Sequence, residues 1–172
     1  QENHSYLNLS LDKPNWNPIS LTPNNALLVI QTSLIENDTV IIQGPPGTGK
    51  TYLMAQICDA LLRANYRIMV TALTNRALIE LVEKEHLKNA LFEGLIYKTS
   101  LTADEQNNKK IKGIKPLKNL KEQKPPLLLS TYYVMSQIAT KVMEEEHFDY
   151  IIVEEASQAF LSTIALAKKL GK

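Results

Sequence analysis

Apolar residues along the chain fall into short runs that alternate between two spacings. Four runs have the length and the β-branched or leucine-rich composition of strands: residues 39–43, 67–72, 127–131 and 150–155. Between them, apolar residues recur at intervals of three and four, which predicts helices at 21–34, 51–62, 74–85, 132–140 and within 156–170. Strands that alternate with helices favour a parallel sheet with right-handed crossovers. The pattern therefore predicts an α/β fold.

Residues with special backbone preferences mark where several of these elements begin and end. The Thr-Pro pair at 22–23 is typical of a helix start, and Asn65 favours the left-handed conformation that ends a helix. Thr74 is a suitable N-cap for the helix that follows it. Residues 1–20 are rich in Asn, Ser and Pro, which predicts an N-terminal arm or interdomain linker. We expect one domain over residues 21–172.

A lysine-rich segment at 98–124 interrupts the alternation. It holds eight lysines and three acidic residues, a local net charge of +5. Lysine recurs at every third position from Lys112 to Lys124, so an extended chain with three residues per turn would place these side chains along one edge. Pro116 disfavours a continuous helix there. Two interpretations stay open, a solvated surface insertion and a contact surface for a phosphate backbone.

Bulk composition restricts the class of protein only loosely. A chain of 172 residues with 44% hydrophobic and 22% charged residues is ordinary for one globular domain. Its net charge of +1 neither indicates nor excludes an acidic partner by itself. The single cysteine, Cys58, lies on the apolar stripe of a predicted helix and cannot form an internal disulfide, which is typical of a reducing compartment. No apolar run approaches the roughly 20 residues of a membrane span. We expect an intracellular protein, cytoplasmic or nuclear, that does not enter a membrane.

A glycine-rich loop follows the first predicted strand and precedes a predicted helix. Residues 44–51 match the phosphate-binding pattern G-x-x-x-x-G-K-[ST] at every required position. They are Gly44, Pro45, Pro46, Gly47, Thr48, Gly49, Lys50 and Thr51. The glycines let the backbone close on a phosphate, and the loop N–H groups and the helix N-terminus attract the anion. Lys50 can reach the β- and γ-phosphates and Thr51 can ligate Mg²⁺. The loop therefore predicts a nucleoside triphosphate site.

Two acidic residues, Glu154 and Glu155, end the last predicted strand. Because ligands of an open α/β sheet lie beyond the carboxyl ends of its strands, we expect both acids to face the crevice that the glycine loop borders. Successive strand residues point to opposite sides, so the acids can divide two tasks. One can hold Mg²⁺, directly or through water, and the other can orient or deprotonate the attacking water. Asp149 is a poorer ligand candidate, since the strand places it roughly 16 Å from Glu154.

Taken together, these motifs resemble superfamily-1 DNA/RNA helicases, in particular the 5′-to-3′ branch that includes the nonsense-decay helicase and senataxin. Residues 43–51 resemble motif I, residues 71–78 motif Ia, and residues 153–158 motif II. The pair 130–131 (Ser-Thr) lies where the family has a further strand end that contacts the nucleic-acid backbone. The resemblance extends from about residue 21 to the C-terminus.

The resemblance implies a RecA-like P-loop NTPase, a parallel sheet with helices on both faces, with ATP and Mg²⁺ as cofactors. It implies a motor that acts on single-stranded DNA or RNA together with a second RecA-like domain of the same full-length protein. Its implied roles are these: Lys50, Glu155 and Gln158 in catalysis; Thr51 and Glu154 at Mg²⁺; residues 44–51 and Asn25 at the nucleotide; Thr74, Asn75, Ser130 and Thr131 at the nucleic acid.

This chain departs from the family at two positions. Glu154 stands where the family has a metal-ligating Asp, and Asn25 stands where the family has the Gln that reads adenine. The chain resembles the first motor domain alone, ending before the family's sensor motif, so we expect it to be nearly inactive by itself. Two other functions stay open: a P-loop ATPase that acts on protein partners, and a nucleotide-dependent binding switch with little hydrolysis, which Glu154 favours.

Overall fold

Five parallel strands form one sheet in the order β3-β2-β4-β1-β5. The computed structural model describes residues 25–141 and 147–171. The strands are β1 (Ile68–Ala72), β2 (Ile96–Lys98), β3 (Lys115–Pro116), β4 (Leu127–Thr131) and β5 (Tyr150–Val153). Because every pairing is parallel, the carboxyl ends of all strands lie at one edge of the sheet. That edge is where ligands of such a sheet bind.

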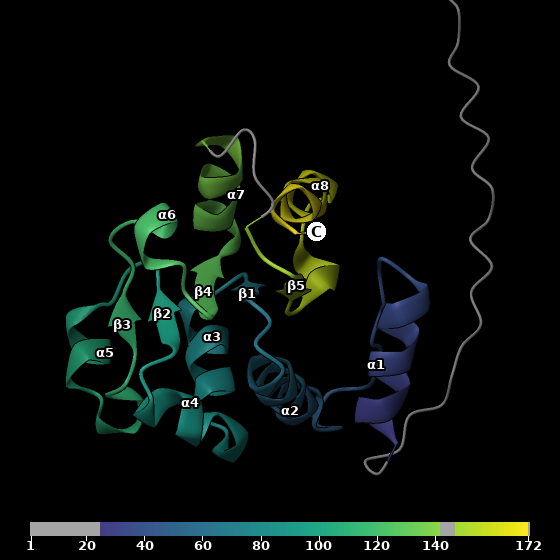
Figure 1. Cartoon of the computed structure of the whole chain (residues 1–172), viewed down its shortest axis with the longest axis horizontal. Helices are drawn as coiled ribbons and strands as arrows, with labels where there is room; N and C mark the ends of the chain where they lie inside the picture. Colours follow the sequence, from purple (N-terminus) through teal and green to yellow (C-terminus); the bar gives the residue numbers. More distant parts are fainter. Residues whose placement is uncertain (1–24, 142–146, 172) are drawn as a thin grey trace, which may run out of the picture.

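Helices cover both faces of this sheet (Figure 1). They are α1 (Ala26–Glu36), α2 (Lys50–Arg63), α3 (Asn75–Val82), α4 (Lys88–Phe92), α5 (Ala103–Asn107), α6 (Leu120–Gln123), α7 (Tyr132–Lys141) and α8 (Leu161–Leu170). Three short 3₁₀ turns complete the described elements: η1 (Glu85–Leu87), η2 (Lys109–Ile111) and η3 (Ala156–Gln158). The predicted α/β fold with helices on both faces is confirmed.

Alternation along the strands divides the core into two clusters. Ile68 and Val70 of β1 face a cluster that includes buried residues of α1, α2, α3 and α4. Met69 between them faces the opposite cluster, which α7 and α8 complete. Side chains of consecutive strand residues point to opposite faces, so a run that is apolar at every position predicts burial on both sides. This explains why β1 and β4 lie at the centre of the sheet.

The predicted caps hold where they fall on described residues. Asn65 has φ +61° and follows α2 in a Schellman motif, in which the Asn65 and Tyr66 N–H groups donate to the carbonyls of Leu62 and Leu61. The Thr74 hydroxyl accepts from the Ala77 N–H at 3.2 Å and caps α3. The predicted Thr-Pro start at 22–23 and the predicted arm at 1–20 lie outside the described residues. The first helix begins at Ala26 in the structure.

The strand predicted at 39–43 is wrong, because this segment makes no ladder in the sheet. β1 already has a neighbour on each side, β4 and β5, so it has no free edge with which residues 39–43 could pair. β5 pairs with β1 alone among the described strands. Residues 39–43 lead into the glycine loop with Ile41 63% exposed and Ile42 packed on the core. A β-branched run forms a strand only where another strand satisfies its backbone groups.

The lysine-rich segment is folded, and its lysines do not follow one extended edge. Residues 103–123 contain α5, η2, β3 and α6, and the Asn119 side chain caps α6 by accepting from two N–H groups. Lys98 is only 1% exposed and belongs to β2. Its Nζ lies 3.1 Å from Glu105 Oε2 and 2.6 Å from the Ser100 carbonyl. The arrangement with three residues per turn is wrong because local caps and the edge strand β3 shape the segment instead.

Packing of α2 against the sheet makes a specific prediction for Cys58. The thiol is fully buried, and burial, with a smaller contribution from Glu154, raises its pKa to about 12. At pH 8 the reactive thiolate fraction is then about 10⁻⁴. We expect iodoacetamide to leave the native chain unlabelled and to add one label per chain in guanidinium chloride, measured by mass spectrometry. Rapid labelling of the native chain would show that α2 is not packed in this way.

Candidate functional site

Residues 44–51 form a loop whose backbone requires glycine. Gly47 and Gly49 have φ +79° and +81°, in the left-handed region that other residues rarely adopt. A Cβ built at either position meets no atom within 4 Å, so the space beside them is open to a ligand. Gly49 is also the N-cap of α2, which begins at Lys50. The loop therefore presents backbone and a helix N-terminus to open space, which is the geometry that binds phosphate.

The side chains of the loop are bonded to its own carbonyls. Lys50 Nζ donates to the Gly44 and Pro45 carbonyls at 2.7 and 2.8 Å. The Thr48 hydroxyl donates to the Pro45 carbonyl at 2.8 Å. These bonds place the ammonium charge at the loop itself. Phosphate oxygens are stronger acceptors for this ammonium than neutral carbonyls.

The loop meets the end of β5 through one hydrogen bond between side chains. Thr51 Oγ1, at the start of α2, donates to Glu154 Oε1 at 3.2 Å, across 103 positions of sequence. The Glu154 N–H donates to the Thr71 carbonyl at 2.9 Å, so its backbone continues the line of β5. The two residues predicted to share a metal ion are thus in direct contact.

The Glu154 carboxyl lies in a setting that disfavours its charge. Burial raises its pKa above the ordinary value, and the charge of Glu155 raises it further. The hydrogen bond from Thr51 and the charge of Lys50 lower the pKa. A partly buried carboxylate costs free energy unless a positive group compensates it. A cation bound at this position would offset that cost.

Glu155 differs from Glu154 in backbone conformation and in exposure. It has φ +55° and ψ +41°, a left-handed conformation, and its side chain is exposed. The strand ends at Val153, so the two acids do not share regular strand geometry, and the predicted strand end at residue 155 is wrong. Gln158 lies at the end of η3, where its N–H donates to the Glu155 carbonyl at 2.8 Å. Gln158 is exposed on the same turn.

Three of the four predicted nucleic-acid residues lie at the surface of the carboxyl edge. Thr74 and Asn75 are exposed just beyond β1. Thr131, at the end of β4, is half-buried and its Cα pairs with that of Ala72, so the two strand ends are neighbours. Ser130 is fully buried and donates to the Thr131 carbonyl at 3.2 Å. Ser130 therefore stabilises the end of β4 from within the core and is not at the surface.

The predicted adenine residue, Asn25, lies at the N-terminus of α1. It is half-buried, and its main-chain carbonyl accepts from the Val29 N–H at 3.0 Å. Ile30 anchors α1 in the cluster that contains α2. The helix that carries Asn25 therefore packs against the helix that follows the loop.

One residue of the site was not predicted from the sequence. The Tyr132 hydroxyl donates to the main-chain carbonyl of Glu154. Tyr132 occupies an inward position of an amphipathic helix, where an aromatic residue is usually part of the core, so no sequence signal connected it with the acids.

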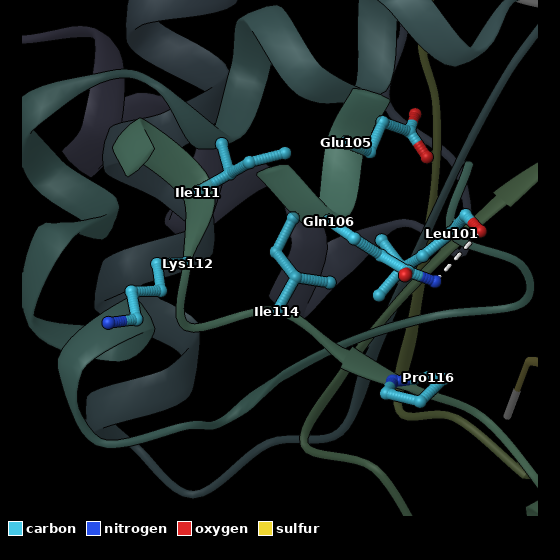
Figure 2. Close-up of a pocket in the computed structure, with 7 residues that line it drawn as sticks. All are labelled: Leu101, Glu105, Gln106, Ile111, Lys112, Ile114 and Pro116. Atoms are coloured by element: carbon cyan, nitrogen blue, oxygen red, sulfur yellow. Dashed lines mark hydrogen bonds between the residues drawn. The ribbon is translucent and has the colours of Figure 1, made fainter. Parts of the chain in front are cut away.

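A pocket of about 240 Å³ lies away from this site (Figure 2). Its lining residues all fall between Leu101 and Pro116, in the lysine-rich segment, with Glu105 and Gln106 beside apolar side chains. None of them is a predicted site residue. No helix in residues 25–141 and 147–171 is long and apolar enough to cross a membrane.

Comparison with known proteins relates this chain to helicases. It is 28% identical over 155 residues to the DNA replication ATP-dependent helicase/nuclease DNA2 of Saccharomyces cerevisiae, covering 82% of this chain and 10% of that protein. It is 34% identical over 55 residues to the DNA polymerase alpha-associated DNA helicase A of Schizosaccharomyces pombe, covering 32% of this chain and 8% of that protein. The chain thus spans about a tenth of the length of either relative. No solved structure matches it.

The two relatives agree with the resemblance to superfamily-1 helicases that the motifs indicated. A protein-family model described as an AAA domain also matches residues 28–171. That region contains the glycine loop, both strand ends with hydroxyl side chains and the two acids. The chain therefore belongs to this family of AAA domains.

Proposed function

We propose that this chain is the ATP-binding motor domain of an ATP-dependent DNA/RNA helicase or translocase. The observation that carries the proposal is the hydrogen bond between Thr51 and Glu154. It joins the end of the phosphate-binding loop to the acid at the end of β5, as a shared metal site requires. The helicase names of the two relatives support the same function.

The residues present fit Mg²⁺. Thr51 Oγ1 and Glu154 Oε1 are hard oxygen donors 3.2 Å apart. Two adjacent ligands of an octahedral Mg²⁺ with bonds of 2.0–2.1 Å lie about 2.9 Å apart. The described residues contain no group of three or more His, Cys, Asp or Glu that could hold a metal. One carboxylate and one hydroxyl suffice here, since Mg²⁺ in such sites completes its shell with phosphate oxygens and water.

Residues of the chain divide the remaining work. Lys50 exchanges its loop carbonyls for β- and γ-phosphate oxygens, and the loop N–H groups hold the same anion. Exposed Glu155 accepts a proton from the attacking water, and Gln158 on the adjacent turn helps to orient that water. Thr51 and Glu154 would hold Mg²⁺, which would supply positive charge to offset the charge that develops on the phosphates. A second RecA-like domain supplies the remaining positive charge.

The nucleic-acid strand lies across the exposed carboxyl ends of β1 and β4. Thr74, Asn75 and Thr131 offer hydroxyl and amide groups to phosphate and sugar. Tyr133, two residues beyond β4, is 72% exposed and offers a ring on which a base can stack. We propose single-stranded DNA or RNA as the partner and an intracellular setting for the full-length protein.

A nucleotide-dependent binding switch is the second candidate. One observation favours it: Glu154 stands where the family that the motifs resemble has a shorter Asp, a departure expected to slow hydrolysis. Measured hydrolysis by the full-length protein separates the two, because a switch would bind ATP and release it unhydrolysed.

The loop makes the first prediction for this function. Lys50→Ala removes charge-assisted hydrogen bonds to phosphate, and we expect Mg·ATP to bind about 10- to 100-fold more weakly in isothermal titration calorimetry. Lys88→Ala, at an exposed lysine on α4, is the matched control and should bind as the wild type does. Equal affinity in Lys50→Ala and wild type would show that residues 44–51 are not the site.

The acid pair makes the second prediction, in the full-length protein. Glu155→Gln keeps the shape of the side chain and removes the base, so kcat should fall by about 10²- to 10⁴-fold with ATP affinity nearly unchanged. Glu154→Gln should instead raise the Mg²⁺ concentration needed for ATP binding. Steady-state kinetics and calorimetry over a Mg²⁺ series measure both.

Glu154→Asp extends that prediction to the departure from the family. We expect it to preserve or raise turnover, because it restores the shorter metal ligand. Loss of activity would show that the site is built around the longer side chain that reaches Thr51.

The lysine-rich segment makes the third prediction. Lys112, Lys115, Lys118 and Lys121 are exposed, and replacing all four with Gln should flatten the salt dependence of oligonucleotide binding. For a single strand, the slope of log K against log salt becomes shallower by about 0.7 for each phosphate that a lysine no longer neutralises. The matched control replaces Lys168 and Lys169, exposed on α8. An unchanged slope, measured by fluorescence anisotropy, would identify the segment as a solvated insertion.

A further inference from the structure

Tyr132 connects two strand ends that are not neighbours in the sheet. It is the first residue of α7 and follows Thr131, the last residue of β4. Its hydroxyl donates to the main-chain carbonyl of Glu154, one residue beyond β5. β4 and β5 flank β1 on opposite sides, so this hydrogen bond passes over the carboxyl end of β1. It is a direct link between the proposed nucleic-acid edge and the acid pair.

The carbonyl that accepts this bond belongs to the peptide that joins Glu154 to Glu155. On one side of that peptide, Glu154 is fixed by its N–H bond to the Thr71 carbonyl and by its side-chain bond to Thr51. On the other side, Glu155 adopts a left-handed conformation that costs free energy in a residue other than glycine. Such a conformation persists only where its surroundings hold it. The Tyr132 hydroxyl holds this peptide through its carbonyl.

The surroundings of Tyr132 make its hydroxyl a dependable donor. The side chain is only 7% exposed. A hydroxyl on a buried side chain needs a hydrogen-bond partner inside the protein, and the Glu154 carbonyl is that partner.

The residues on either side of Tyr132 are more accessible than its buried ring. Tyr133 is 72% exposed, and the half-buried Thr131 accepts from the Val134 N–H at 3.5 Å through its hydroxyl. The first turn of α7 thus carries one buried ring between two accessible groups. A strand that contacts Thr131 or Tyr133 acts on the same turn that aims the Tyr132 hydroxyl.

We propose that Tyr132 is a positioning residue that transmits nucleic-acid binding at the end of β4 to the orientation of Glu154 and Glu155. This inference rests on the proposed function and assigns the regulation of that site to one hydroxyl. Contact with a strand shifts the first turn of α7, and the hydrogen bond carries the shift to the peptide between the two acids. Without the hydroxyl, both sites persist and the communication between them disappears.

The test compares ATP hydrolysis by the full-length protein with and without a single-stranded oligonucleotide. Tyr132→Phe keeps the buried ring and removes only the hydroxyl. We expect the stimulation of kcat by the oligonucleotide to fall about tenfold, while KM for ATP and the Kd for the oligonucleotide stay within about twofold of the wild type. Tyr150→Phe is the matched control. Tyr150 is the first residue of β5, at the opposite end of that strand from Glu154, so this substitution should leave the stimulation of kcat unchanged.

Amide hydrogen exchange adds a readout of the local geometry. In Tyr132→Phe, exchange should become faster at residues 153–158 and stay as in the wild type in α2 and β1. In the wild type, the oligonucleotide should change exchange at 153–158, and in Tyr132→Phe it should not. Faster exchange throughout the chain would mean a general loss of stability and would overturn the positioning role.

The failures are distinguishable. A wild-type protein that hydrolyses ATP equally with and without the oligonucleotide, or not at all, would overturn the proposed function and the coupling with it. Wild-type stimulation that persists in Tyr132→Phe would overturn the coupling and leave the motor function standing. An equal loss of stimulation in Tyr150→Phe would also overturn it, because the effect would then not be specific to the bond with Glu154.

Discussion

The site depends on one hydrogen bond, from the Thr51 hydroxyl to the Glu154 carboxylate. Its partners lie 103 positions apart, so it can form only if the start of α2 and the end of β5 reach the same edge of the sheet. β5 ends at that edge because all the strands are parallel, and α2 begins there because it runs back along the sheet to the start of β1. The bond also offsets part of the cost of a partly buried carboxylate whose pKa burial raises. The fold thus brings Thr51 to Glu154, and their hydrogen bond in turn stabilises the carboxylate at the end of β5.

The sequence predicted the elements whose signals are local and dense. β1 and β4 each begin with three consecutive apolar residues and are buried along almost their whole length, and caps such as Asn65 depend on a single residue's backbone preference. The strand at 39–43 was wrong because a strand requires a neighbour, which no local pattern supplies. β2 and β3 are only three and two residues long. They form strands because β2 pairs with β4 and β3 pairs with β2. Lys98 in β2 is buried, but its charge placed this stretch in the lysine-rich segment when only the sequence was considered.

The candidate site was predictable where the order and spacing of residues in the sequence define it. The loop, with Lys50 and Thr51, follows from its motif, and the two acids follow from their place at the end of an apolar run. The strand alternation that was expected to separate them does not apply, because the strand ends at Val153 and Glu155 has a left-handed backbone. The bond from Tyr132 was not predictable, because it depends on the strand order, which sets β4 and β5 on either side of β1.

That strand order also brings the two proposed sites together. Glu154, just beyond β5, contacts the start of α2, and Thr74 and Thr131 lie at the ends of the neighbouring strands β1 and β4, so the proposed nucleotide and nucleic-acid sites would share one edge of the sheet. Glu155 and most of the loop are exposed to solvent, whereas phosphoryl transfer depends on positive groups placed around the transferred phosphoryl. The described residues around the loop supply Lys50 as such a group. A surface that covers the loop and brings a further cation would complete the site, and the exposed position of Glu155 leaves it facing that surface.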